Sequence, residues 1–203
     1  CSPSNPTGAA YTEPQLRALA AVLRERNLWV IVDEIYGQLV YDGFRQVSLA
    51  SVAPELADRL VIVDGASKTY AMTGWRIGWM LAPEVLAEAC ERVQGQATSN
   101  ACSIAQHATV AALEGAVAHS GELEAMLVEF NARRRLMVEG LNAIPGRSCR
   151  MPEGAFYAFP SVAGLLGRQT AEGRVLATDV DVCDWLLDAA RVALVPGTAF
   201  GAP

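Results

Sequence analysis

The chain has 203 residues, of which 52% are hydrophobic and 19% charged, so it is long enough to bury a core and too apolar for a disordered segment. Its net charge of -6 at pH 7 excludes the basic surface that nucleic-acid binders need, and we expect no nucleic-acid partner. No uninterrupted apolar run approaches the roughly eighteen residues of a membrane span, so we expect a soluble chain with no membrane partner. A cytoplasmic location is a separate expectation.

The cysteines and histidines give no sign of a structural cross-link. Five widely spaced cysteines form no C-x-x-C pair, and the two histidines are His107 and His119. We therefore expect neither a disulfide framework nor a metal site. The chain starts at Cys1 inside a turn-rich segment and stops at Pro203 just after another, so we expect an interior fragment of a longer protein.

One lysine stands alone among the basic residues. Fifteen of the sixteen are arginine, and the exception is Lys68. A lysine amine can lose its proton and attack a carbonyl, which a guanidinium cannot do. A codon bias toward arginine would leave the same composition, so this count alone keeps both explanations open.

The first part of the chain alternates predicted helices and strands. Turn formers at 2–8 precede a helix that begins with a capping box at Thr12 and Gln15 and ends near Asn27. A continuous apolar run at 28–32 predicts a parallel strand covered on both faces. A helical stretch at 54–59 then leads into a strand at 60–63, and this order indicates an α/β layer structure with ligands beyond the carboxyl ends of the strands.

The remaining pattern predicts further elements and a second domain. These elements are a strand at 77–82, helices at 83–96, 103–119 and 121–144, a strand at 155–159, a helix at 179–191 and a strand at 192–195. The pattern changes to a mixed α/β segment beyond Pro145, and we place the domain boundary inside the preceding long helix, which predicts two domains, 1–130 and 131–203. The predicted fold class is α/β with a mostly parallel sheet.

Polar residues that could carry chemistry follow the predicted strands. An acid and a tyrosine come after the first strand, an amine after the second, and an arginine eight residues later, which together offer an anion clamp next to an amine. A nucleotide-binding phosphate loop is excluded, because Ser67 stands where that motif requires glycine, and Ile62 stands at its other glycine position. The candidate site residues are Asn5, Asp33, Tyr36, Ser67, Lys68 and Arg76.

Four blocks in this order resemble those of fold-type I aminotransferases that use pyridoxal phosphate, most closely the bacterial aspartate aminotransferases of class I. The blocks lie at 4–8, 32–36, 67–78 and 152–157. The resemblance implies that the α/β fold is part of the large cofactor-binding domain of such a transferase, followed by part of a smaller α/β C-terminal domain.

The resemblance also assigns a role to each candidate residue. It implies that Lys68 forms the internal aldimine and later moves a proton between the substrate α-carbon and the cofactor. Asp33 matches the carboxylate that pairs with the pyridine nitrogen. Tyr36 and Asn5 match donors to the phenolic oxygen, and Ser67 and Arg76 match phosphate ligands.

Two departures from the family pattern stand out. Gly65 occupies a position where many relatives carry a second phosphate-binding serine. The family's glycine- and serine-containing loop, its ring-stacking aromatic and its substrate-carboxylate arginine have no counterpart in the chain, so we expect an incomplete site. We predict that Phe156 and Tyr157 pack in the core.

The expected function is transfer of an amino group between an amino acid, aspartate first or another acidic or aromatic one, and a 2-oxo acid such as 2-oxoglutarate. The resemblance also implies a homodimer at full length. Three alternatives stay open: a lyase or synthase with the same cofactor, an aminotransferase-like effector domain of a transcription regulator, and an unfolded or inactive remnant.

Overall fold

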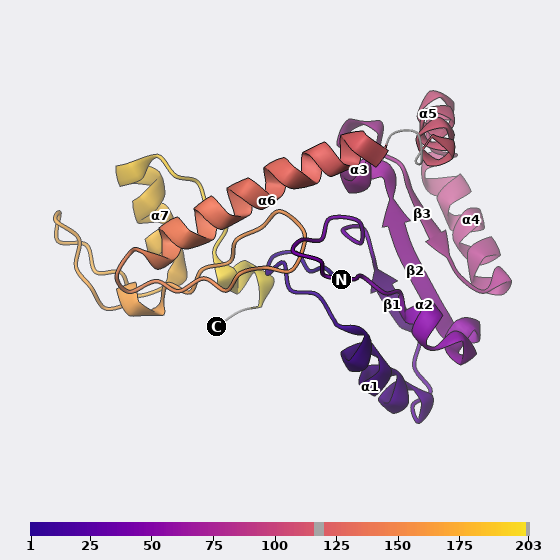
Figure 1. Ribbon diagram of the computed structural model, residues 1–203, viewed down its shortest axis with the longest axis horizontal. Helices are drawn as coiled ribbons and strands as arrows, with labels where there is room; N and C mark the ends of the chain where they lie inside the picture. The colour runs from indigo at the N-terminus through magenta and orange to yellow at the C-terminus, as the bar shows by residue number, and fades with distance from the viewer. Residues whose placement is uncertain (116–119, 202–203) are drawn as a thin grey trace. The chain divides into compact units, whose positions relative to one another are not determined.

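The computed structural model describes residues 1–115 and 120–201. The chain forms two compact units, the first made of Cys1–Ala132 and Pro152–Phe156, the second of Arg133–Met151 and Tyr157–Pro203. The elements, drawn in Figure 1, are α1 (Glu13–Arg24), β1 (Val30–Asp33), α2 (Leu49–Val52), η1 (Pro54–Arg59), β2 (Leu60–Gly65), α3 (Ala66–Thr69), η2 (Thr73–Trp75), β3 (Gly78–Leu81), α4 (Glu84–Thr98), α5 (Ser103–Glu114), α6 (Ser120–Asn142), η3 (Ala163–Leu165), α7 (Asp179–Ala190) and η4 (Gly197–Phe200).

The first unit is built on a three-stranded sheet in the order β1-β2-β3. β1 pairs with β2 in parallel, with Asp33 opposite Val63. β2 pairs with β3 in antiparallel fashion, with Gly65 opposite Gly78. The α/β class is confirmed, and the sheet, predicted to be mostly parallel, is mixed here, with one parallel and one antiparallel pairing.

Helix α1 begins at its predicted capping box and ends at Arg24, three residues before the predicted end near Asn27. The predicted capping box forms, since the backbone N–H of Thr12 donates to Gln15 Oε1 at 2.9 Å. The apolar face of α1 buries Leu16 and Ala20 in a core with α2, η1 and β2. This core covers one face of the sheet, because alternate strand residues point to that side.

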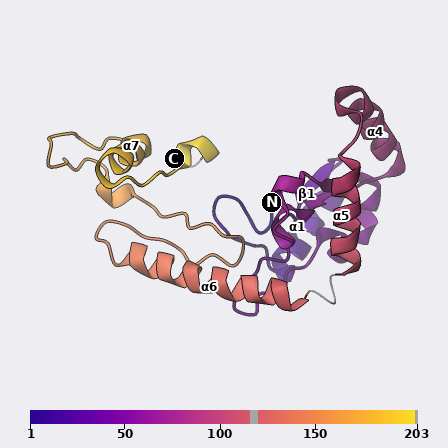
Figure 2. The same ribbon diagram turned by 90° about the horizontal axis from the view of Figure 1, so that it is seen from above.

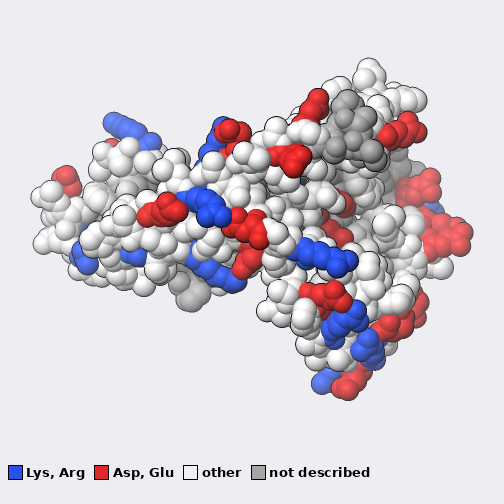
Figure 3. All heavy atoms as spheres, in the orientation of Figure 1, with Lys and Arg blue, Asp and Glu red and all other residues white. Residues whose placement is uncertain are grey.

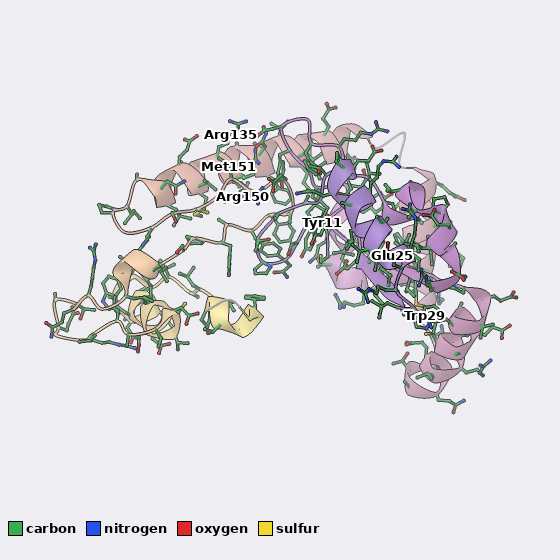
Figure 4. All side chains as sticks on the ribbon, turned by 90° about the horizontal axis from the view of Figure 1, so that it is seen from below. Tyr11, Glu25, Trp29, Arg135, Arg150 and Met151 are labelled. Atoms are coloured by element: carbon green, nitrogen blue, oxygen red, sulfur yellow. The ribbon has the colours of Figure 1, made fainter. Side chains whose placement is uncertain are left out.

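The other face of β1 is open among the described residues. Ile31 is 72% exposed, and Trp29, just before the strand, is 60% exposed. Trp29 lies near Glu25, at the end of α1 opposite Tyr11 (Figure 4). The prediction that this strand is covered on both faces is therefore wrong for the described chain, since its helical cover lies on one side only.

The helices after β3 follow the sequence predictions closely. The helix predicted at 83–96 forms as α4, and the one predicted at 103–119 forms as α5 to Glu114, with 116–119 outside the described residues. Both lie beyond β3 in Figure 1, and the view from above in Figure 2 again finds them together. The long helix predicted at 121–144 forms as α6.

A short segment from late in the chain completes the first unit. Gly154 N donates to the carbonyl oxygen of Gly8 at 2.9 Å, and Ala155 N donates to that of Leu39 at 2.8 Å. Val40 forms an antiparallel bridge with Gly154. These bonds attach 152–156 to two loops at the carboxyl end of the sheet.

Two strand predictions are wrong. The segment 155–159 does not form a strand, because Ala155 takes a left-handed conformation with φ of 58°, which interrupts an extended run. The segment 192–195 also forms no strand. Val192 N instead donates to the carbonyl oxygen of Leu186, which closes the end of α7.

The second unit has its own small core. Leu165, Leu176 and Val182 pack together, with α7 capped by a bond from Asp181 N to Thr178 Oγ1 at 3.1 Å. The predicted helix at 179–191 is confirmed as α7.

Charged side chains of both signs are interspersed over α1 on the face that Figure 3 shows. Arg17 pairs with Glu13 at 2.6 Å, and Arg24 pairs with Glu55 at 2.5 Å. None of the helices in the described ranges combines the length and the hydropathy that crossing a bilayer requires.

Candidate active site

Three of the candidates, Asp33, Ser67 and Lys68, lie at the carboxyl end of the parallel strand pair. Asp33 is the last residue of β1, and Glu34 N still bonds to the carbonyl oxygen of Val63 at 2.9 Å. β2 continues to Gly65, two residues after Val63, and leads directly into α3, which carries Ser67 and Lys68. Two parallel strands end at the same edge of a sheet, so their following loops share it.

Asp33 is held at this edge by its own turn. Its Oδ1 accepts a hydrogen bond from Ile35 N at 3.0 Å, and its carbonyl oxygen accepts one from Ser2 N at 3.0 Å. The side chain is partly buried. The first bond uses one carboxylate oxygen, and the second ties the N-terminal segment to the end of β1.

The amine of Lys68 lies against two aromatic rings. Its Nζ is 5.8 Å from the ring centroid of Tyr36 and 5.5 Å from that of Phe156, within cation–π range of both. The two rings meet edge to face with their centroids 5.5 Å apart. The structure thus brings Lys68 next to Tyr36. Tyr36 itself follows Asp33 by three residues in the chain.

The other three candidates lie in α3, in the turn after η2 and in the N-terminal turn. Ser67 is partly buried in α3, directly before Lys68. Arg76 is exposed, and its Nη1 donates to the carbonyl oxygen of Thr73 in its own turn at 3.0 Å. Asn5 is exposed on the turn that follows Ser4.

Two glycines allow the N-terminal segment and the segment around residue 152 to approach each other more closely than a side chain would permit. A Cβ on Gly8, which has φ of 66°, would lie 2.4 Å from Pro152 Cβ. A Cβ on Gly154 would lie 2.5 Å from Pro3 Cγ. Only glycine leaves room for these approaches, which fix the first block of the chain against the last.

The edge carries a group of three acids, Asp33, Glu34 and Asp64. Burial raises the pKa of Asp64, and the negative charges of Glu34 and Asp33 add to that rise, while a hydrogen bond from Gly65 N at 2.6 Å opposes it. The charges of Glu34 and Asp33 therefore act on Asp64 at this edge of the sheet.

Sequence reasoning missed two contributors to the site. Phe156 was predicted to lie in the core, but the residue is 43% exposed, and the amine of Lys68 lies over its ring. Tyr41 was not singled out, although its hydroxyl donates to the carbonyl oxygen of Ala155. The block at 152–157 was the only signal available for Phe156, and nothing in it specifies the partner.

The donor set suits a flat heteroaromatic aldehyde with a phosphate arm. It offers the amine of Lys68 beside the ring of Tyr36, a carboxylate at the end of the neighbouring strand, and a hydroxyl and a guanidinium on the segments that follow β2. In 1–115 and 120–201, by contrast, no three His, Cys, Asp or Glu side chains gather as metal ligands would. The residues present fit pyridoxal phosphate.

Comparison with known proteins identifies the class of the chain. The family model described as "Aminotransferase class I and II" matches residues 1–203, and the chain belongs to this family. An aspartate aminotransferase of Rhizobium meliloti (strain 1021) is 51% identical over 201 residues, covering 98% of this chain and 48% of the relative. A probable aspartate/prephenate aminotransferase of Rhizobium leguminosarum bv. phaseoli is 47% identical, covering 98% of this chain and 50% of the relative.

A solved structure matches the whole described fold. The crystal structure of the aspartate aminotransferase from Rhizobium meliloti superposes with a TM-score of 0.94 at 50% identity, covering all of this chain and 50% of that one. The chain spans about half the length of the relatives it matches.

Proposed function

We propose that this chain is part of a pyridoxal-phosphate-dependent aminotransferase that moves an amino group between aspartate and a 2-oxo acid such as 2-oxoglutarate. The observation that carries the proposal is the amine of Lys68, the chain's only lysine, which lies against Tyr36 at the sheet edge that also carries Asp33. Membership of the aminotransferase family and the names of the relatives support it.

The roles of the six residues follow from their chemistry. Bound pyridoxal phosphate would supply an aldehyde for an amine and a ring that withdraws electrons from the substrate α-carbon. Lys68 would hold the cofactor and carry the proton to and from that carbon. Asp33 would keep a positive charge on the ring nitrogen, because a carboxylate favours the protonated form of a nearby base.

The remaining residues would orient the cofactor. Tyr36 and Asn5 would donate hydrogen bonds to its phenolic oxygen. Ser67 would donate to its phosphate, and Arg76 would bind the same group through a forked pair, since a guanidinium matches phosphate geometry. For that pair, Arg76 would exchange its bond with the carbonyl oxygen of Thr73.

We also propose that residues 1–130 belong to a large cofactor-binding domain and 131–203 to a small C-terminal domain. The division into two compact units within α6 supports this assignment. The return of 152–156 to the first unit adds one detail, because it would let the small-domain sequence contribute Phe156 to the site.

The complete protein is further proposed to be a cytoplasmic homodimer. The family resemblance supports this proposal. Light scattering on the purified complete protein should give twice the monomer mass, and cell fractionation should find it in the cytoplasm. A monomer that is fully active, or recovery in another compartment, would contradict it.

The function can be tested on the protein expressed with its full coding sequence. Purified protein should show the visible absorbance of bound pyridoxal phosphate, and aspartate with 2-oxoglutarate should yield oxaloacetate and glutamate. The Lys68→Ala variant should lose the absorbance and the transfer. Lys68→Arg is the matched control for charge, since it keeps a cation at this position but cannot attack the aldehyde, and it should be equally inactive.

Product analysis separates the alternatives. An aminotransferase conserves the amino group in its second product, whereas a lyase would release fragments of the amino acid without needing the 2-oxo acid. Prephenate is the second acceptor to test, because it appears in the name of the Rhizobium leguminosarum relative. Normal transfer by Lys68→Ala would refute the proposal.

A further inference from the structure

We propose that Phe156 is a positioning residue for Lys68, so that its ring, together with that of Tyr36, holds the amine at the sheet edge. This inference deepens the proposed function and rests on it for its meaning in catalysis. Its direct support is geometric: the Nζ of Lys68 lies slightly closer to the ring centroid of Phe156, at 5.5 Å, than to that of Tyr36, at 5.8 Å.

The ring of Phe156 is itself braced on two sides. It meets Tyr36 edge to face at an interplanar angle of 81°, and it meets Phe130 at a centroid distance of 5.6 Å. Offset and edge-to-face aromatic pairs are the favourable arrangements for such rings. The contact with Lys68 is therefore made by a ring with a defined orientation.

The backbone before Phe156 is fixed by bonds from distant parts of the chain. Ala155 adopts φ of 58°, which is uncommon for a non-glycine residue. Its N–H donates to Leu39, and its carbonyl oxygen accepts from the hydroxyl of Tyr41. Strained conformations of this kind persist where the surroundings determine them, and here they set the direction in which the next side chain leaves the backbone.

The exposure of Phe156 fits a role at a site better than a role in a core. Its side chain is 43% exposed, whereas its neighbour Ala155 is fully buried. A phenylalanine placed for packing alone would gain more by full burial. Restricting the flexible side chain of Lys68 costs conformational entropy, and the cation–π attraction of the two rings offsets that cost.

The contact can be measured without the cofactor. The complete protein, stripped of cofactor, is treated with an acetylating succinimidyl ester, and acetylation of the Lys68 peptide is followed by mass spectrometry. Loss of one cation–π contact should raise the acetylation rate about three- to tenfold in Phe156→Leu. Phe156→Tyr keeps the ring and should stay within about twofold of the wild type.

Phe159→Leu is the matched control, since it removes a phenylalanine ring that meets Phe200 edge to face within the second unit. It should leave the acetylation rate unchanged. An equal rate in Phe156→Leu and the wild type would overturn the inference. If Phe156→Leu does not fold, a Phe156→Tyr rate more than about threefold above the wild type would overturn it as well.

A second arm asks whether Phe156 acts through Lys68. The dissociation constant of pyridoxal phosphate is measured for the wild type, Phe156→Leu, Lys68→Ala and the double variant. Phe156→Leu should weaken binding only when Lys68 is present, whereas equal weakening in both backgrounds would overturn a positioning role. A wild type that binds no pyridoxal phosphate would refute the proposed function, and the acetylation rates would still decide whether Phe156 holds Lys68.

Discussion

The hydroxyl of Tyr41 donates a hydrogen bond to the carbonyl oxygen of Ala155, 114 positions further along the chain. Tyr41 is 5% exposed, and its own N–H donates to the carbonyl oxygen of Glu153 at 3.1 Å. These two bonds attach the segment before Phe156 to the loop that follows Tyr36. The fold thereby connects a late sequence block to the site at the end of the sheet.

Replacing Tyr41 by Phe should destabilise this connection. The substitution keeps the ring but leaves a buried carbonyl oxygen without this donor, so we expect the free energy of unfolding to fall by about 1–3 kcal/mol. Urea denaturation of the complete protein measures the change. Tyr11→Phe is the control, because Tyr11 is 50% exposed and should change stability by less than about 0.5 kcal/mol. Equal stability of both variants would contradict the prediction.

The charge of Asp33 can be removed with little disturbance of its turn. In Asp33→Asn the amide oxygen can still accept from Ile35 N, so we expect a stable protein. The neutral side chain no longer stabilises a positive ring nitrogen, and turnover should fall about 10²- to 10³-fold. Steady-state transfer from aspartate measures this loss.

Glu34→Gln is the matched control for Asp33→Asn. It removes one negative charge from the neighbouring residue and can keep the bond from Ser48 Oγ, which is 2.7 Å long. Turnover within a few-fold of the wild type is expected. If both variants lose activity to the same extent, the loss reflects the general charge of the edge rather than a specific role of Asp33.

Local signals allowed the sequence to predict α1, β2 and α6, because a capping box, a continuous apolar run and a helical period each lie within one segment. They also pointed to Lys68 as chemically distinct. Local signals could not predict the contact between the ring of Phe156 and that amine, since it depends on bonds between segments far apart in the chain. The predicted strand at 155–159 failed for the same reason, because those bonds hold Ala155 in a left-handed conformation.

Gly65 should resist conversion to the serine that the family resemblance implies at this position. A Cβ there would lie 2.8 Å from the carbonyl oxygen of Ile77 and 3.1 Å from Ile35 Cδ1. Because a backbone atom is the nearer obstacle, Gly65→Ser should lower the free energy of unfolding by about 1–3 kcal/mol. It should also fail to tighten pyridoxal phosphate binding, because the strand must shift to admit the side chain.

Gly95→Ala is the control for Gly65→Ser. Gly95 lies inside α4 with no atom within 4 Å of an added Cβ, so alanine should stabilise the helix by up to about 1 kcal/mol. Thermal unfolding and a cofactor titration on both variants provide the measurements. A serine variant that is as stable as the wild type and binds the cofactor more tightly would show that the position has room.

Burial of Asp64 makes a specific contribution to the pH dependence of stability. Its pKa is raised above the ordinary value of 3.8, so the folded protein holds this proton more tightly than the unfolded chain. The stabilisation that this proton gives the folded protein is therefore fully present below pH 3.8. It is lost as the pH rises through the higher pKa that Asp64 has in the folded state. At neutral pH the ionised carboxylate is partly buried beside Glu34 and Asp33, which disfavours folding.

Asp64→Asn should therefore raise the free energy of unfolding more at pH 7 than it does near pH 4. The amide oxygen can still accept from Gly65 N, so the turn is retained. Urea denaturation of the wild type and the variant at both pH values measures the difference. Asp58→Asn, at an exposed position in η1, controls for the loss of one negative charge and should change stability by less than about 0.5 kcal/mol. A stabilisation by Asp64→Asn that is larger at pH 4 than at pH 7 would contradict the assigned direction, because a raised pKa makes the ionised form the unfavourable one.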